Sequence, residues 1–291
     1  MAWKNKEDVY QTVTDKIVAL LEKGVAPWKK PWTGGERPRN LITDNAYHGF
    51  NRFMLQYAVD EAYKSPYFLT YHQARGLGGY ASKGETGWPI TYFEMKKYKT
   101  GDMDDDGNVI TKRVPMIKKS TVFNLDQCSD VKVPKGRRDN IIETYNHDRV
   151  LTKAQGIIDA MEPAPRIQYG PKARYFPGPD IVEHPPKEKF SSLEHYYATV
   201  FHELIHWTGH STRLDRLGRS KFRGDEDYSQ EELAAEMGSA FLCADAGIVD
   251  DTVEQSASYI NGWLNKLRSD KKFLVGASSQ AEKATSFIHG G

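Results

Sequence analysis

The stretch Phe201-His-Glu-Leu-Ile-His-Trp-Thr-Gly-His210 carries the pattern that decides the fold of the C-terminal half. Its residues His202 and His206 are four positions apart, so on a helix their imidazoles project from one face. Two histidines placed in this way can bind one metal ion, with Glu203 beside the open coordination position. The alternative interpretation is two histidines that are satisfied inside the packing face of an ordinary helix.

Zinc is the metal that best matches this pattern. A zinc ion with three protein ligands keeps one water, lowers the pKa of that water to about 7 and polarises a peptide carbonyl. Glu203 would then accept the proton of the water and later deliver it to the leaving amine. We therefore predict a zinc metallopeptidase site with a zincin-like fold and one zinc ion, with manganese or another divalent metal as the alternative.

The third ligand must come from residues after His206. A histidine six positions further on would complete a long protease motif, but Thr212 stands there. His210 is a possible ligand, although Gly209 is expected to end the helix and turn the chain away. We therefore expect His210 behind a ligand or on the substrate side. His210 and Tyr228 are also the hydrogen-bond donors that could face an oxyanion.

A carboxylate from the next helix would complete a site with two histidines and one glutamate. Glu232 and Glu236 are four positions apart and share a helical face, so one can bind the metal while the other orients a ligating histidine. We predict Glu232 as the ligand, Glu236 as the orienting acceptor and Glu231 as a solvated neighbour. In the competing interpretation, Glu232 only closes a capping box with Ser229.

The rest of the C-terminal half mixes helices with a small sheet. Helical spacing covers 150–161, and 173–182 is typical of an edge strand interrupted by a Pro-Gly-Pro turn. Ser191-Ser-Leu-Glu194 predicts the start of the helix that carries the histidines to Gly209. A second capping pattern at Ser229 predicts a helix that extends to about Ala246.

The N-terminal half also mixes helix and strand. An apolar stripe over residues 8–23, followed by Gly24, predicts an amphipathic helix. A second helix is expected over 53–62 and a strand over 88–93. The basic, turn-rich segment 131–140 is typical of a linker. We predict an α+β protein of two domains, residues 1–128 and 146–291, joined by a linker over 129–145.

The composition narrows the class of protein. The 291 residues are 39% hydrophobic and 27% charged, and no apolar run approaches the length of a membrane span. The first residues are charged and lack the pattern of a secretory signal. Cys128 and Cys243 are far apart and without metal-type spacing, which argues against a disulfide framework. We expect a cytoplasmic protein that does not contact a membrane; the sequence does not specify its oligomeric state.

Aromatic and basic residues gather in the N-terminal third. Residues 1–135 have a net charge of +5 and residues 136–291 a net charge of −4. Flat rings beside cations suit single-stranded nucleic acid, because bases stack on the rings while Lys and Arg neutralise phosphates. An aromatic-rich core under a solvated basic surface explains the same composition. The candidate DNA-binding residues are Trp28, Lys29, Lys30, Trp32, Arg39, Arg52 and Lys83.

The motifs, taken in order, resemble the ArdC family of antirestriction proteins, which conjugative plasmids and phages carry. The matching segments span nearly the whole chain. They are Val25–Trp28 with Pro31-Trp32, Arg39-Asn40, Tyr47–Asn51, Lys83–Glu85, Val122–Gln127, Tyr175–Pro186, His202–His210 and Glu231–Glu236.

This resemblance implies an N-terminal single-stranded-DNA-binding domain joined to a zincin-like domain. The expected function is protection of incoming plasmid or phage DNA against host restriction, with single-stranded DNA and an unidentified protein substrate as partners. The alternative is a non-catalytic protein that shields single-stranded DNA and uses the metal only to stabilise its fold.

Overall fold

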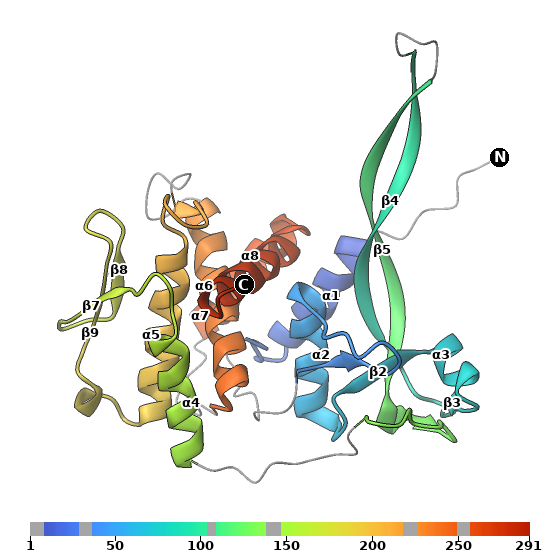
Figure 1. Ribbon diagram of the computed structural model, residues 1–291, viewed down its shortest axis with the longest axis horizontal. Coiled ribbons are helices and arrows are strands. Elements are labelled where there is room, and N and C mark those ends of the chain that lie inside the picture. The colour runs from blue at the N-terminus through green and yellow to red at the C-terminus, as the bar shows by residue number, and fades with distance from the viewer. Residues whose placement is uncertain (1–8, 29–36, 104–108, 138–146, 218–225, 249–256) are drawn as a thin grey trace.

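Two groups of elements follow one another along the chain and meet at a common set of helices (Figure 1). The computed structural model describes residues 9–28, 37–103, 109–137, 147–217, 226–248 and 257–291. Helices and strands alternate irregularly in both groups, which confirms the predicted α+β class.

The N-terminal group is built on a sheet of strand order β1-β2-β5-β4. Strand β2 runs parallel to β1 and antiparallel to β5, and β3 and β6 form a separate short pair. The elements of this group are α1 (Val9–Leu21), β1 (Arg39–Asn40), α2 (Gly49–Ala62), β2 (Tyr67–Thr70), α3 (Tyr71–Gly76), β3 (Tyr80–Ala81), β4 (Trp88–Met103), β5 (Val109–Asn124), η1 (Leu125–Gln127) and β6 (Cys128–Ser129).

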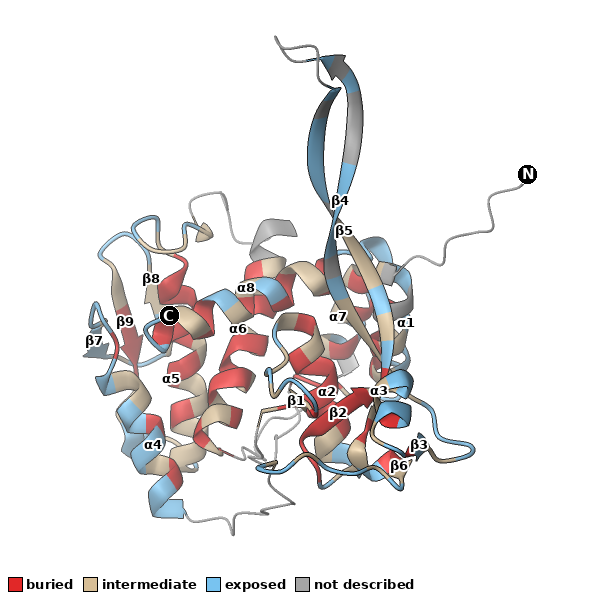
Figure 2. Cartoon of the chain, turned by 45° about the vertical axis from the view of Figure 1, so that its right-hand side comes forward, coloured by how far each residue is buried: buried red, intermediate tan, exposed pale blue. Residues whose placement is uncertain are grey.

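Strands β4 and β5 form a long antiparallel ribbon, which we call the arm. Their pairing runs from Trp88 opposite Val122 to Lys99 opposite Thr111 and, after a shift of register, resumes with Met103 opposite Val109. Strand β5 pairs with β2 only from Val122 onward, so most of the arm has no third strand. The arm rises away from the body of the protein, and most of its described surface is exposed (Figures 1 and 2).

The C-terminal group places helices beside a small sheet of strand order β7-β9-β8. Helix α6 packs between α5 and α8. The elements are α4 (His147–Asp159), β7 (Arg166–Tyr169), β8 (Arg174–Phe176), β9 (Ile181–His184), η2 (Lys187–Lys189), α5 (Leu193–Thr208), α6 (Glu226–Ala246), α7 (Ala257–Ser269) and α8 (Phe273–Ile288). Over the described ranges, no helix combines the length and the apolar character that a membrane crossing requires.

Helix boundaries differ in two places from the capping patterns in the sequence. Helix α5 begins after Ser192, whose side chain accepts a hydrogen bond from the amide of His195, so the N-cap lies one residue after the predicted Ser191. Helix α6 begins at Glu226, so Ser229 lies inside the helix and is not its N-cap. The capping-box interpretation of Glu232 is therefore wrong.

The two groups share one hydrophobic core. Trp28, Phe53 and Met54 from the N-terminal group pack in the same cluster as Met237 and Leu274 from the C-terminal group. Helices α1 and α2 thereby cover α7 and α8. Because this apolar surface is buried only when both groups are folded, the hydrophobic effect holds them together as one body.

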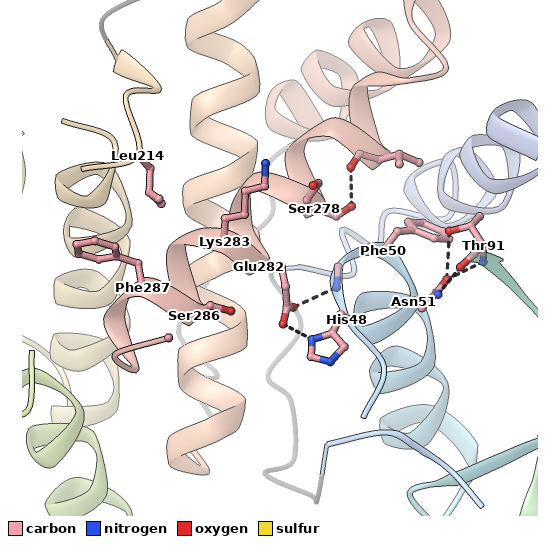
Figure 3. A pocket seen from close by; sticks show the side chains of 14 residues that line it. His48, Phe50, Asn51, Thr91, Leu214, Ser278, Glu282, Lys283, Ser286 and Phe287 are labelled. Atoms are coloured by element: carbon pink, nitrogen blue, oxygen red, sulfur yellow. Dashed lines mark hydrogen bonds and ion pairs between the residues drawn. The ribbon is translucent and has the colours of Figure 1, made fainter. Parts of the chain in front are cut away.

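A polar junction lies beside this core, between α2 and α8 (Figure 3). The Glu282 carboxylate accepts hydrogen bonds from the amide of Gly49 and from His48, at 3.1 and 2.9 Å, and pairs with Arg37. Arg52 pairs with Asp245 of α6 at 2.6 Å. The adjoining cavity has a volume of about 500 Å³ and is lined by residues of both groups. The N-terminal group thus supplies Arg37 and Arg52 to the junction, and the C-terminal group supplies the two carboxylates and His289, which pairs with Asp245 at 3.2 Å.

Residues 130–137 remain on the surface of the N-terminal group. Strand β6 pairs with β3, and Arg137 donates hydrogen bonds to the carbonyls of Leu41 and Ile42 at 2.9 Å. Residues 138–146 lie outside the described residues. The predicted boundaries at 128 and 146 stay a prediction.

Candidate metal centre

Helices α5 and α6 approach closely enough to form a site between them. Val200, Phe201 and Leu204 of α5 are buried, which fixes the face that α5 turns toward the core. On α6, a Cβ atom at Gly238 would lie 2.7 Å from Cδ1 of Ile205, so only glycine permits this separation of the two helices. The packing places the histidines of α5 opposite the first turns of α6.

Three side chains converge across this contact. Nε2 of His202 lies 3.1 Å from Nε2 of His206. The carboxylate oxygens of Glu232 lie 3.7 Å from His202 Nε2 and 3.5 Å from His206 Nε2. Ligand atoms about 2.0 to 2.2 Å from a tetrahedral zinc ion are separated from one another by roughly 3.3 to 3.6 Å. The spacing of the three residues therefore fits one tetrahedral metal ion.

The far side of the His206 ring fixes its tautomer. Its Nδ1 lies 3.2 Å from a carboxylate oxygen of Glu231, which can only accept a hydrogen bond. Nδ1 therefore carries the proton, and the lone pair of Nε2 faces His202 and Glu232. Glu231 is 6% exposed, so the prediction that it is a solvated neighbour is wrong.

Glu231 is in turn held by Arg216. The guanidinium donates two hydrogen bonds of 2.9 Å to the two oxygens of that carboxylate. It also donates to the carbonyl of Ile205 and to the hydroxyl of Thr208, near the end of α5. Arg216 thus ties the loop after α5 to both helices of the site, and this bidentate geometry restrains the orientation of Glu231.

The contact between His206 and Glu231 shifts their two pKa values in opposite directions. Burial lowers the pKa of His206, but the hydrogen bond and the charge of Glu231 outweigh burial, so the net shift of this pKa is upward. Burial raises the pKa of Glu231, but the hydrogen bonds and charges of His206 and Arg216 lower it by more than burial raises it. The net shift of this pKa is therefore downward. Glu231 therefore stays ionised behind the imidazole.

Glu203 is close to the same ring. It is buried on α5, and its charge is among those that raise the His206 pKa. Glu232 and His202 are more accessible, with 30% and 24% of their side chains exposed. The cluster thus has one buried side, closed by Glu231 and Arg216, and one side that reaches the surface.

Each half of the chain matches a known protein family. Residues 7–123 match the family described as the N-terminal domain of anti-restriction factor ArdC, and residues 152–280 match the zincin-like metallopeptidase family. The crystal structure of the antirestriction ArdC protein from plasmid R388, in its metal-free form, is 35% identical with a TM-score of 0.75. The match covers 97% of each chain. This chain belongs to the ArdC family of antirestriction proteins.

Other relatives extend the comparison. The Mn(II)-bound structure of the same R388 protein matches with a TM-score of 0.73. Protein y4eC of Sinorhizobium fredii is 29% identical over 97% of this chain and 92% of its own length. DNA primase TraC of Escherichia coli is 33% identical, but the chain spans only 27% of its length. The ArdC architecture therefore also forms part of a much longer protein.

The remaining residues predicted for the metal centre of this ArdC member lie apart from the cluster. Glu236 interacts with Tyr259, and Glu231 takes the place beside His206 that we predicted for Glu236. His210 follows the end of α5, and its Nδ1 pairs with the hydroxyl of Thr212 at 2.8 Å. The side chain of Tyr228 lies outside the described residues. The structure thus corrects the orienting acceptor from Glu236 to Glu231.

Two predicted DNA-binding residues belong to the shared core. Trp28 is 3% exposed, packs edge-on against Trp263 and donates its indole hydrogen to the Tyr259 hydroxyl at 2.8 Å. Arg52 is 1% exposed, and its guanidinium lies over the ring of Phe241. Neither side chain can meet a nucleic acid, so both predictions are wrong. The pairing of rings with cations occurs here inside the protein.

The other predicted DNA-binding residues differ in accessibility. Lys83 is exposed in the loop between β3 and β4. Arg39 is partly exposed and donates a hydrogen bond of 2.8 Å to the carbonyl of Asp44. Lys29, Lys30 and Trp32 lie outside the described residues. Among the members of the predicted set that the structure describes, Lys83 has the position that best suits contact with a nucleic acid.

A second polar cluster, which the sequence did not predict, lies near the end of α5. Arg213 pairs with both carboxylate oxygens of Asp180, and its guanidinium stacks on Trp207 of α5. The Tyr175 hydroxyl donates to the same carboxylate at 2.7 Å. The Arg213 hydrogen bond is the main cause that lowers the Asp180 pKa to about 2. The cluster attaches the loop after α5 to the small sheet.

Proposed function

We propose that this chain is an antirestriction protein that binds single-stranded DNA and carries a metal-dependent peptidase site. It would protect incoming plasmid or phage DNA from restriction in a new host. Membership of the ArdC family supports the antirestriction role. The convergence of His202, His206 and Glu232 is the observation that supports the metal site.

We assign His202, His206 and Glu232 as ligands of one divalent metal ion, with zinc as the expected ion. The Mn(II)-bound R388 relative supports a divalent ion in this family. Among the described residues, the group contains three protein ligands. Catalytic zinc sites use three protein ligands, whereas structural sites use four, so the donor set favours catalysis over a purely structural metal.

The protein residues then divide the work of peptide hydrolysis. The metal would supply Lewis acidity toward a water and a peptide carbonyl. Glu203, as general base, would accept a proton from the water and pass it to the leaving amine. Glu231 would hold the His206 proton on Nδ1, which keeps Nε2 available as a donor.

We assign the DNA-binding role to the segment up to residue 128 and the peptidase role to residues 146–291. The match of residues 7–123 to the ArdC N-terminal family supports the first assignment, and the basic charge of that half agrees with it. Lys83 is the exposed basic residue of the predicted set that we assign to this contact.

The Glu203→Gln variant tests whether hydrolysis is needed. The amide cannot act as a general base, yet the ligands and Glu231 remain, so we expect unchanged metal content and lost peptidase activity. Two measurements decide the outcome: metal content by elemental analysis, and the frequency with which an unmodified plasmid enters a restricting host. Protection should fall to the level without the protein.

If the Glu203→Gln variant protected the plasmid as well as the unsubstituted protein, hydrolysis would not be needed for protection. That result would favour a protein that shields single-stranded DNA and uses its metal only for structure. The control is Glu188→Gln, at an exposed position of η2. A separate measurement of single-stranded oligonucleotide binding by both variants should match the unsubstituted protein, because neither change touches the assigned DNA-binding half.

A further inference from the structure

Each strand of the arm is 16 residues long, but only its base packs in a core, through Trp88, Ile90 and Val122. At about 3.3 Å per residue it extends roughly 50 Å. Met95, Tyr92 and Val114 are among its exposed apolar side chains, with Met95 56% exposed. Such a two-stranded ribbon is marginally stable by itself. Its length therefore requires a role outside the body of the protein.

The charge of the arm is strongly one-sided. Residues 88–101 and 109–124 contain seven Lys and Arg, and Glu94 is their single acid. Glu94 pairs with Lys118. The acids Asp102 and Asp104–Asp106 lie between these two segments in the sequence. The shaft of the arm, between its tip and its base, therefore presents a positive surface.

The register of the strands divides the shaft into two faces. Lys97 lies directly opposite Arg113, on the face that also carries Met95. Glu94, Lys96 and Lys112 lie on the other face, because neighbouring residues of a strand alternate between faces. We call the surface of Lys97, Arg113 and Met95 the basic face.

Neither cation of the basic face has an ion-pair partner within the described residues. Two like charges directly opposite each other weaken a ribbon. A polyanion that lies over both removes this repulsion, and the release of its counterions favours binding. The basic face is therefore complementary to a phosphate backbone.

The shape of the arm favours duplex DNA over a single strand. A projecting two-stranded ribbon fits the major groove of B-DNA, which is about 12 Å wide. Proteins that hold single strands instead offer a groove lined by several stacking rings. The exposed side chain of Met95 is suited to apolar contact with a thymine methyl group in the major groove.

We propose that the arm is a duplex-DNA-binding ribbon, which enters the major groove with Lys97 and Arg113 against the phosphates or base edges. This function goes beyond the proposed single-stranded-DNA binding. It would let one chain contact both the entering strand and the duplex made from it, the form that restriction endonucleases cleave.

Lysines on a ribbon also have a simpler effect, since they prevent exposed edges from pairing with other chains. Charge reversal separates the two roles. A glutamate keeps the edge charged and protected, but it repels phosphate. The test variant is therefore Lys97→Glu with Arg113→Glu, in the full-length chain.

The matched control is Lys96→Glu with Lys112→Glu, which makes the same change of charge on the opposite face. Fluorescence anisotropy measures the binding of each protein to a labelled 20-base-pair duplex and to one of its strands, over a range of salt concentrations. Circular dichroism and melting confirm that the variants fold.

We expect the basic-face variant to bind duplex at least about tenfold more weakly than the control variant. The slope of its log affinity for duplex against log salt concentration should be smaller in magnitude by about two, because each lost phosphate contact reduces the slope by about one. Single-strand affinity should change by less than about twofold, since we assign that contact to Lys83 and its surroundings.

The proposal would be overturned if the unsubstituted protein did not bind the duplex, or if the basic-face variant bound it as tightly as the unsubstituted protein. Equal losses of duplex affinity in the basic-face variant and the control variant would also overturn it. A loss confined to the single strand would also overturn it and would assign the arm to single-strand binding. Failure of the unsubstituted protein to bind any single strand would instead contradict the proposed function, whatever the duplex result.

Discussion

At the scale of single residues, the metal centre depends on two adjacent glutamates with different tasks. Successive residues of a helix point in directions about 100° apart. Glu232 therefore faces Nε2 of both histidines, while Glu231 reaches Nδ1 of His206 from behind. Arg216 holds Glu231 in that position. The pair encloses one imidazole between a proposed ligand and an orienting carboxylate.

We predict that Glu231→Gln lowers the affinity for Zn²⁺ or Mn²⁺ by about 10- to 100-fold, the usual effect of losing a carboxylate behind a ligating histidine. Calorimetric titration of the metal-free protein measures this affinity. Glu236→Gln, one turn further along α6, is the matched control and should leave it unchanged. Equal affinities of Glu231→Gln and the unsubstituted protein would show that the orientation of His206 does not need this contact.

The sequence predicts the proposed ligand set because its spacing is local. His202 and His206 need only a helix, and Glu232 is a carboxylate on the next helix that the sequence predicts. Glu231 could not be chosen over Glu236 in the same way, because the choice depends on how α6 is rotated against α5. Arg216 arrives from a loop, and loops carry no periodic pattern.

At the scale of elements, the separation of α5 and α6 sets the dimensions of the metal centre. His202 and His206 lie on one helix and Glu232 on the other. Gly238 leaves the space that the fully buried Ile205 fills. Since Ile205 is surrounded by core side chains, it cannot move aside for an added methyl group.

Gly238→Ala should therefore push the two helices apart. We expect a loss of about 1 to 3 kcal/mol of unfolding free energy from overpacking, together with weaker metal binding. Chemical denaturation and metal titration measure the two effects. Gly262→Ala, on the exposed side of α7 where a Cβ atom meets nothing within 4 Å, should instead gain about 0.5 to 1 kcal/mol. Similar behaviour of the two variants would contradict the helix-spacing argument.

The helices and strands were largely predictable from the sequence, but the contacts that their side chains make were not. The stripe over 8–23 and the strand from Trp88 appear as α1 and β4. Trp28 and Arg52 are amphipathic residue types that suit either a nucleic acid or each other, and composition does not decide between them. The length of β4, to Met103, also escaped prediction because its exposed half lacks alternating hydrophobicity.

At the scale of the whole molecule, the two groups of elements are joined by the shared core and by the junction at Glu282. Burial raises the pKa of Glu282, but Arg37 and Arg52, with His48 and the Gly49 amide, outweigh it. The Glu282 pKa is therefore lower in the folded protein than in the unfolded chain. The stabilisation from this group is complete above its unfolded pKa, about 4.3, and is lost as the pH falls through the lower folded value.

Glu282→Gln should accordingly cost about 1 to 3 kcal/mol of unfolding free energy at pH 7, since charged hydrogen bonds across the junction are lost. Its melting temperature should depend less on pH between about 5 and 3 than that of the unsubstituted protein. Differential scanning calorimetry at several pH values measures both effects. Glu188→Gln, an exposed position, serves as control; parallel pH profiles for all three proteins would exclude Glu282 as a source of acid sensitivity.

The shared core also constrains how such a chain can be inherited. Trp28 contacts Phe53 within its own half and reaches Trp263 and Tyr259 in the other. Recombination that joins the front half of one relative to the rear half of another would place unmatched surfaces against each other. We therefore expect the two halves to be inherited together, and a substitution at Trp28 to require compensation more than 200 positions away in the sequence. The occurrence of the same pair of halves within a much longer primase is what such joint inheritance predicts.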